Sequence, residues 1–565
     1  MKVRLPLMVQ DQAAAAPGMR PVEHFEVDRD EVFLDGPVSS RLAVLDLDAK
    51  SQRLRRGARF RAPTGGEPGT YDVPDELDFE SSEFIQVSVF ATVLRTIEMF
   101  EEADTLGRPL EWAFGAPQLL IVPRAGEWPN AFYDRDSHSL QFFHFPSKSD
   151  HNNLKTVYTS LSHDIVAHET GHAILDGIAR DLYSAISPQS LALHEAIADL
   201  TALTMAFRSA SVRGTVLRET GGSIRDSTAF TRLAEEFGAA LDPERRRFYL
   251  RNVLNDRKLD DDDVDGTDPH DLSEVLTGAL YMVMVKLHEY HKRRLAETRP
   301  HSSEQAASGE ALFVAAEQFQ RMVFRALDYL PPGEISFADY GRAIIASDQA
   351  AHPGSGFGRD WVREEFVRRG IVPSPDALAV PEPRMEPALE GVALQTLLDS
   401  DWAAYDFANR HRELIGIPAE IPFEVRPRLK TEKREYHRGG PVDVVECLFK
   451  VAWRETEPNP PGRWFTEERQ IVGGTTLAIA WGEPRGPLRV CLSTQSEDQR
   501  EARDRLLLRL DDEGVLMPAR QASAYDGEPL RSVVPVDVAG DLMRVRGTAR
   551  TLHVAPRQPA DGSVT

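Results

Sequence analysis

The chain has 565 residues, and its 66 basic and 89 acidic side chains give a formal net charge of -23 at pH 7. This length predicts two to four structural units, and the negative charge disfavours nucleic acid or an anionic membrane as a partner. With only Cys447 and Cys491 available, a disulfide-dense scaffold is excluded. We find no signal peptide and no apolar run of about 18 residues, so we expect no membrane span. We expect a cytoplasmic location, with non-classical export as the alternative.

The first part of the chain alternates strand-like and helical patterns. Residues 1–80 are interrupted by glycine and proline and are predicted to be rich in strands. An amphipathic helix is predicted after Ser81, a candidate N-cap, and a short buried strand follows over 119–122. Residues 130–133 and 140–145 flank a polar turn, which predicts a β-hairpin. Its edge is suited to binding an extended peptide as a further strand, although a purely structural hairpin gives the same pattern.

A candidate metal site begins with the sequence His168-Glu169-Thr170-Gly171-His172, on a helix predicted over about 160–184. At about 100° per residue, both imidazoles face one side of a helix and can bind one metal ion. Glu169 lies about 100° further round, where its carboxylate can hold a water next to that ion as a general base. The motif alone is a weak indication, because a solvent-exposed helix face can carry the same residues.

The next predicted helix, over 190–208, strengthens the metal interpretation because it carries Glu195 and Asp199 on one face. Two imidazoles and the Glu195 carboxylate form a three-ligand set, which leaves a fourth position open as in a catalytic zinc site. Asp199 would accept the N–H of a ligand histidine and fix its tautomer. A contact between Asp199 and a buried backbone group is the simpler alternative.

These paired motifs resemble the active-site core of the thermolysin-like zinc metallopeptidases, which are gluzincins. In that family HExxH and a downstream ExxxD lie on neighbouring helices. The resemblance covers about residues 81–373 and implies one catalytic Zn²⁺ bound by His168, His172 and Glu195, with Glu169 as the general base. It does not extend to the calcium site of the family, where Ala206 stands in place of a carboxylate, so a calcium requirement is doubtful.

Three further segments fit the same resemblance. Tyr183 matches a tyrosine that donates to the oxyanion of the tetrahedral intermediate. His270, in the sequence Asp265-Gly266-Thr267-Asp268-Pro269-His270, matches a second oxyanion donor, and Asp265 matches the aspartate that orients it. Asn130 and Ala131 match an edge-strand segment that holds the substrate. A core tyrosine, a capping histidine and an ordinary hairpin are the structural alternatives for these positions.

The remaining segments are predicted from their patterns, and no chemistry is visible in the last 150 or so residues. Residues 210–269 are predicted to be irregular, and the acidic run 260–263 is interpreted as a solvated loop. Helices are predicted over 272–293 and 312–330 and after Ser336. Prolines crowd residues 374–387, which predicts a semi-rigid linker. A helical segment over 389–414 precedes alternating apolar patterns at 445–453, 475–481 and 488–492, which predict a small antiparallel α+β module.

The patterns and the resemblance together predict an α+β protein with a gluzincin catalytic unit. The expected parts are a strand-rich segment (1–80), a β-rich upper lobe with the substrate-binding edge strand (81–159), a helical zinc-binding lobe (160–373), the proline-rich linker (374–387) and a C-terminal α+β domain of unknown role (388–565). The implied function is a zinc endopeptidase that acts on peptide or protein substrates. A gluzincin-type aminopeptidase and a non-catalytic, zinc-stabilised binding protein are the alternatives.

Overall fold

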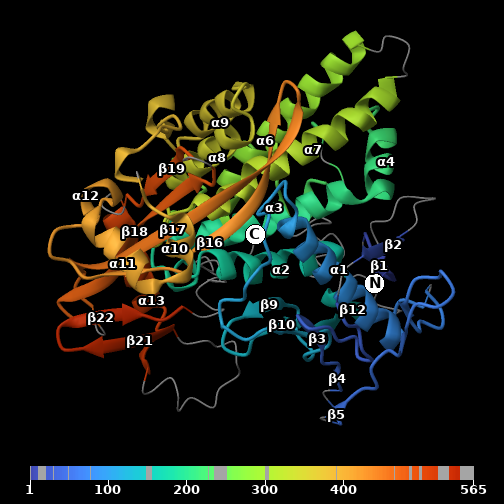
Figure 1. The fold of residues 1–565 in the computed structure, drawn as a ribbon. Helices are drawn as coiled ribbons and strands as arrows, with labels where there is room; N and C mark the ends of the chain where they lie inside the picture. Colours follow the sequence, from blue (N-terminus) through green and yellow to red (C-terminus); the bar gives the residue numbers. More distant parts are fainter. Residues whose placement is uncertain are drawn as a thin grey trace.

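Helices and strands are both abundant in the computed structural model, so the fold class is mixed α+β (Figure 1). The structure describes residues 2–10, 21–28, 31–48, 50–51, 53–76, 78–147, 156–226, 228, 230–233, 251–298, 304–389, 391–462, 465–482, 486–495, 499–519 and 534–547. Among the helices in these ranges, none is both long and apolar enough to cross a membrane.

The N-terminal part consists of short strands around one long helix, α1 (Ser82–Glu101). Its strands are β1 (Lys2–Met8), β2 (Val22–Asp28), β3 (Leu42–Val44), β4 (Leu47–Asp48), β5 (Arg53–Leu54), β6 (Phe60–Arg61) and β7 (Thr70–Tyr71). The antiparallel pair β1–β2 packs on α1, and Ser81 caps that helix by accepting the N–H of Phe84. The predicted cap is therefore confirmed.

A four-stranded sheet under the centre of the molecule has the order β3-β8-β10-β9. After β3, its strands are β8 (Leu119–Val122), β9 (Ala131–Asp134) and β10 (Ser139–Phe142). β9 and β10 pair antiparallel, which confirms the predicted hairpin. β9 is the edge strand, so one side of its backbone faces away from the sheet. A small separate ladder follows, formed by β11 (His144–Pro146) and β12 (Thr156–Tyr158).

Helices form the middle layer, with α2 and α3 at its centre (Figure 1). The elements are η1 (Thr159–Leu161), α2 (His163–Ile178), η2 (Leu182–Ser184), α3 (Pro188–Arg208), α4 (Ala210–Glu219), β13 (Arg232–Leu233), β14 (Arg251–Asn252), α6 (Pro269–Thr298), α7 (Glu304–Tyr329), α8 (Phe337–Ala351) and α9 (Phe357–Arg368). Ser336 and Asp339 form the capping box expected at the start of α8. The prediction of irregular structure throughout 210–269 is wrong, because α4 forms there: half of its ten residues are weak helix formers, but Val212, Val216 and Leu217 become buried.

The C-terminal part is an eight-stranded sheet with helices packed against it. Its elements are η3 (Pro375–Leu378), η4 (Pro387–Leu389), α10 (Leu394–Asp399), α11 (Asp401–Arg410), α12 (Arg412–Ile415), β15 (Phe423–Val425), β16 (Leu429–His437), β17 (Gly440–Pro458), β18 (Glu468–Ala480), β19 (Leu488–Ser493), α13 (Arg500–Asp512), β20 (Leu516–Pro518), β21 (Val534–Ala539) and β22 (Leu542–Val545). Two strand pairs, β18–β22 and β20–β21, are parallel, so the expectation of a purely antiparallel module is wrong. The helical segment predicted over 389–414 is divided into three short helices and the turn η4.

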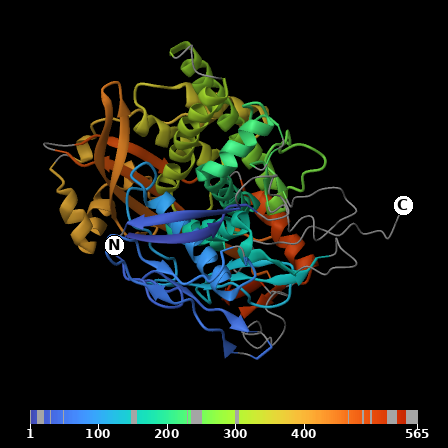
Figure 2. The same cartoon turned by 90° about the vertical axis from the view of Figure 1, so that its right-hand side faces the viewer.

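The C-terminal sheet packs against α7 and α8, and the second view shows it behind the helical layer (Figure 2). Leu448 and Ala478 join the main hydrophobic core, while Phe449 and Leu477 on the opposite face join a second core with α10 to α12. The proline-rich segment is attached at two places, since Leu378 is buried in the main core and Arg384 bridges to Leu488. The proline-rich segment is therefore held at one place by the main core and at another by β19 of the C-terminal sheet.

Buried charges reinforce the junction between α7 and the sheet. Lys433 on β16 contacts Asp328 at 2.8 Å and Glu446 at 3.8 Å. Asp328 also binds Arg108 at 2.7 Å, and Glu446 binds Arg325 at 3.3 Å. We call these five residues the junction ion network. Since each ion has a partner of opposite sign, the desolvation of one charge is offset by its neighbour.

Candidate metal centre

The two central helices approach closely because α2 carries a glycine where it crosses α3. A Cβ atom at Gly171 would lie 3.0 Å from the Ala198 Cα and 3.0 Å from the Thr201 hydroxyl. Carbon atoms normally pack at about 3.5–4.0 Å, so a side chain at position 171 would push the helices apart. The glycine stands between the two histidines of the HExxH motif, and it allows α3 to bring Glu195 against them.

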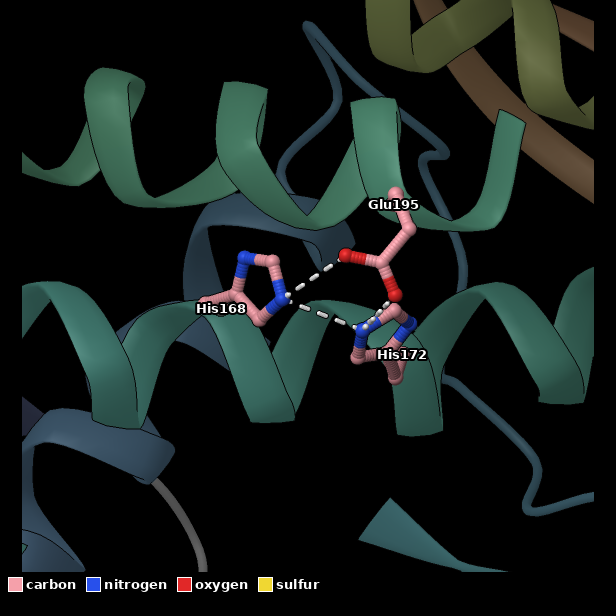
Figure 3. Close-up of side chains that lie close together, drawn as sticks. All are labelled: His168, His172 and Glu195. Atoms are coloured by element: carbon pink, nitrogen blue, oxygen red, sulfur yellow. Dashed lines mark hydrogen bonds and ion pairs between the residues drawn. The ribbon is translucent and has the colours of Figure 1, made fainter. Parts of the chain in front are cut away.

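Three side chains meet between these helices (Figure 3). His168 and His172 project from α2, and their Nε2 atoms lie 3.1 Å apart. The Glu195 carboxylate points from α3 toward both, with 3.6 Å to the His168 Nε2 and 3.5 Å to the His172 Nε2. All three side chains are buried. This is the arrangement that the spacing of the two motifs predicts.

The triangle of donor atoms fits a tetrahedral metal ion. Bonds of about 2.0–2.1 Å at tetrahedral angles place neighbouring nitrogen and oxygen donors about 3.3–3.4 Å apart. The two Nε2 atoms are 3.1 Å apart, and the Glu195 carboxylate faces both of them, with Oε2 at 3.6 Å from His168 and Oε1 at 3.5 Å from His172, close to that spacing. Two imidazoles and one carboxylate are also a donor set that suits a first-row divalent ion. His168, His172 and Glu195 can therefore hold a metal with little rearrangement.

Each histidine is oriented by a second partner. Asp199 lies one turn after Glu195 on α3, and its Oδ1 is 2.9 Å from the His168 Nδ1. An N–H on Nδ1 that donates to this carboxylate leaves the lone pair of Nε2 for the metal, as expected. The Nδ1 of His172 faces the Nδ1 of His194 at 3.1 Å. The sequence predicts no role for His194, because adjacent helix positions lie about 100° apart and its ring is not expected on the face of Glu195.

Glu169 faces the edge strand β9. Its Oε2 accepts the backbone N–H of Tyr133 at 3.0 Å, so the free edge of the strand reaches the carboxylate. The same strand is anchored to α2 by Asp176, which accepts the Tyr133 hydroxyl at 2.7 Å and pairs with Arg135. The predicted general base and the predicted substrate strand are thereby adjacent.

Asn130 and Ala131 lie at the start of this strand. The Asn130 Oδ1 accepts the Ala131 N–H at 2.9 Å, and the Asn130 backbone carbonyl accepts the Thr159 hydroxyl at 3.3 Å. The amide side chain therefore shapes the entry to β9. The predicted contacts of both residues with a substrate remain predictions.

Tyr183 lies on η2, behind His194. Its ring centroid is 6.3 Å from that of His194 and 5.9 Å from that of Tyr133, and the guanidinium of Arg135 lies over its ring. The hydroxyl accepts the backbone N–H of Arg135 at 3.4 Å. A phenol that accepts this bond keeps its own proton to donate. Burial raises the pKa of Tyr183 well above its ordinary value, which keeps the hydroxyl protonated.

His270 is brought to the site by the start of α6. Its Nε2 lies 3.4 Å from the Glu195 Oε2, and its side chain is 31% exposed. The acidic partner given by the structure differs from the one predicted: Asp268 has its Oδ1 at 3.6 Å from the His270 Nδ1 and accepts the His270 backbone N–H at 2.9 Å. Burial raises the pKa of Asp268, but its contacts with His270 outweigh this and hold the pKa below its ordinary value.

Asp265 instead organises the loop that precedes His270. Its Oδ1 accepts the Thr267 N–H at 2.9 Å and the Thr267 hydroxyl at 2.7 Å. Arg509, from α13 of the C-terminal part, donates to the Thr267 hydroxyl at 3.1 Å and lies 3.4 Å from the Asp265 Oδ2. A buried side chain of the C-terminal part therefore supports the loop that carries the candidate oxyanion donor. This contribution has no signal in the local sequence, because the two segments are far apart in the chain.

Access to the centre is one-sided. His172 and Glu195 are fully buried, whereas His168 and Glu169 retain 6% and 4% exposure and His270 is the most exposed of the group. The exposed surface of the group therefore belongs mainly to His270, with small contributions from His168 and Glu169.

No protein-family model and no curated protein matches this sequence. The function proposed below is therefore inferred from the side chains and their geometry.

Proposed function

We propose that this protein is a zinc-dependent endopeptidase of the gluzincin type. The observation that carries the proposal is the meeting of His168, His172 and Glu195 in one buried triangle, with Glu169 beside it at the free edge of β9. Two imidazoles and a carboxylate favour Zn²⁺, and a three-ligand set is typical of catalytic rather than structural zinc. The edge strand supplies the backbone groups that an extended peptide requires.

The chemistry divides among the residues around the triangle. His168, His172 and Glu195 would hold the ion, which supplies Lewis acidity toward water and the substrate carbonyl when bound. Glu169 takes the proton of the attacking water and passes it to the leaving amine. The Tyr133 N–H holds one carboxylate oxygen of Glu169, which orients the side chain for both transfers.

The oxyanion formed on the substrate carbonyl needs hydrogen-bond donors. His270 is positioned next to Glu195 and can donate from Nε2. Tyr183 is a second donor in this proposal, since its hydroxyl proton is left available by the Arg135 contact. Donors of this kind act mainly on charge that exists in the transition state and therefore raise kcat.

The test is zinc analysis together with turnover of internally quenched peptides whose amino terminus is blocked. Glu169→Gln should keep a full complement of zinc and lose about 10²–10⁴-fold in kcat, the usual contribution of a general base. Asp164→Asn, on the same helix, is the matched control and should keep wild-type turnover. Retention of wild-type activity by the Gln variant would contradict the mechanism. Cleavage restricted to peptides with a free amino terminus would favour an aminopeptidase instead.

A further inference from the structure

A cavity lies where the segment between α2 and α3 meets the C-terminal sheet. It has a volume of about 480 Å³. Arg135 and Ser184 line it from the catalytic side, Trp453 and Val472 from β17 and β18, and Val545 from β22. The cavity therefore exists only because the C-terminal part packs beside the proposed active site.

The lining of this cavity is rich in arginine. Five of the residues that line it are arginines: Arg135, Arg180, Arg426, Arg454 and Arg544. Such a cluster is unexpected in a chain whose net charge is -23. An arginine fork binds carboxylates with two parallel hydrogen bonds, so the cluster favours a carboxylate ligand.

The acidic side chains at the cavity are already occupied. Asp181 lies 2.9 Å from Arg426, and Glu424 lies 2.7 Å from the same guanidinium. Glu334 is buried, accepts the Ile186 N–H at 3.0 Å and pairs with an arginine of α13. These acids therefore do not neutralise the remaining arginines.

Three of the arginines are exposed: Arg180, Arg454 and Arg544. Within the part of the chain that the structure describes, none of the three forms an ion pair with a carboxylate. They come from the segment after α2, from β17 and from β22. Three separate segments thus contribute exposed arginines to the lining of one cavity.

The cavity adjoins the end of the proposed substrate strand. Arg135 directly follows β9, its backbone N–H binds the Tyr183 hydroxyl, and Ser184 is the next residue after that tyrosine. Arg135 is two residues beyond Tyr133, whose N–H meets Glu169. At about 3.3 Å per residue, a peptide that continues the edge of β9 would enter the cavity two to four residues from the scissile bond.

We propose that this cavity binds acidic side chains of the peptide substrate, two to four residues from the bond that is cleaved. The inference rests on the proposed peptidase function and adds a substrate class to it. The remaining surface repels acidic peptides, because it carries the excess negative charge. The arginines of the cavity attract acidic side chains locally. The cavity would therefore select substrates that carry an acidic segment at a fixed distance from the bond that is cleaved.

The test compares quenched peptides that share a cleavable centre and carry either two Glu or two Gln residues two to four positions away on either side. Wild-type protein should cleave one Glu peptide with a kcat/KM about five- to tenfold above its Gln partner, as expected for two partly exposed ion pairs. Arg454→Glu combined with Arg544→Glu should abolish this ratio. Arg500→Glu with Arg505→Glu, which reverses two exposed charges on α13 outside the cavity, should retain it. The milder pair Arg454→Gln and Arg544→Gln keeps the test valid should the reversed charges impair folding.

Binding separates the two proposals. A fluorescent form of the preferred Glu peptide is titrated onto the Glu169→Gln variant, with and without the two cavity substitutions. If the Glu and Gln peptides are cleaved with equal kcat/KM, or if their difference in kcat/KM survives in the cavity variants, the acidic-peptide site is overturned while the proposed peptidase function is retained. Arginine-dependent binding with no cleavage by wild type supports the acidic-peptide site and overturns the peptidase. Neither binding nor cleavage overturns both.

Discussion

The close crossing of α2 and α3 makes a sharp prediction for Gly171→Ala. The added methyl would sit 3.0 Å from the Ala198 Cα, which belongs to the backbone of α3 and cannot rotate away. Restoring an ordinary carbon contact requires the helices to separate by roughly 0.5–0.8 Å. Metal–ligand bonds tolerate only about 0.2 Å, so the separation would pull Glu195 out of reach of the two histidines.

The energetic consequence falls mainly on metal binding. Overpacking costs about 1–3 kcal/mol, while replacing a helical glycine with alanine returns about 0.5–1 kcal/mol, so the metal-free protein should lose only about 0–2.5 kcal/mol of stability. Zinc affinity should fall at least about 10–100-fold, the effect of disturbing a ligand's support. Competition with a chromogenic chelator measures the affinity, and thermal unfolding with and without EDTA measures the stability.

Gly214→Ala is the matched control, because a Cβ on this α4 glycine would meet nothing within 4 Å. It should leave zinc affinity unchanged and raise stability slightly. Wild-type zinc affinity in Gly171→Ala would refute the idea that this glycine sets the ligand geometry.

Two further predictions concern residues outside the ligand triangle. Asp268→Asn should lower kcat by up to about 10²-fold with zinc content unchanged, because it loosens His270 and with it one oxyanion donor. If Asp265→Asn lowered kcat more than Asp268→Asn does, Asp265 and not Asp268 would be the residue that orients His270. Lys433→Met should lower the free energy of unfolding by about 1–3 kcal/mol, because Asp328 and Glu446 lose a buried charged partner while each keeps an arginine. Urea denaturation measures this loss, with the exposed Lys430→Met on the same strand as the control, and equal stability of the two variants would contradict it.

Local patterns predicted an element correctly where a single cap, a turn or a fixed spacing decides where it forms. Ser81 and Ser336 cap their helices as expected, and the hairpin of β9 and β10 forms where two strand-like segments flank a polar turn. The spacing within α2 placed His168 and His172 on one face because helix geometry alone fixes that relation. The missed helix α4 has weak propensity and is held by burial of its apolar face. Its stability comes from tertiary contacts that no local pattern records.

The sequence by itself determined which atoms are available as ligands and general base, because a helix turns the same way wherever it lies. Only the tertiary structure decided which partners those atoms meet. It brought Asp268 rather than Asp265 to the ring of His270, His194 to His172, and the N–H of Tyr133 to Glu169. It also placed Arg509 behind the His270 loop and assembled five distant arginines around one cavity. Contacts of this kind depend on how separate elements pack, and the side chains that make them are distant in the chain.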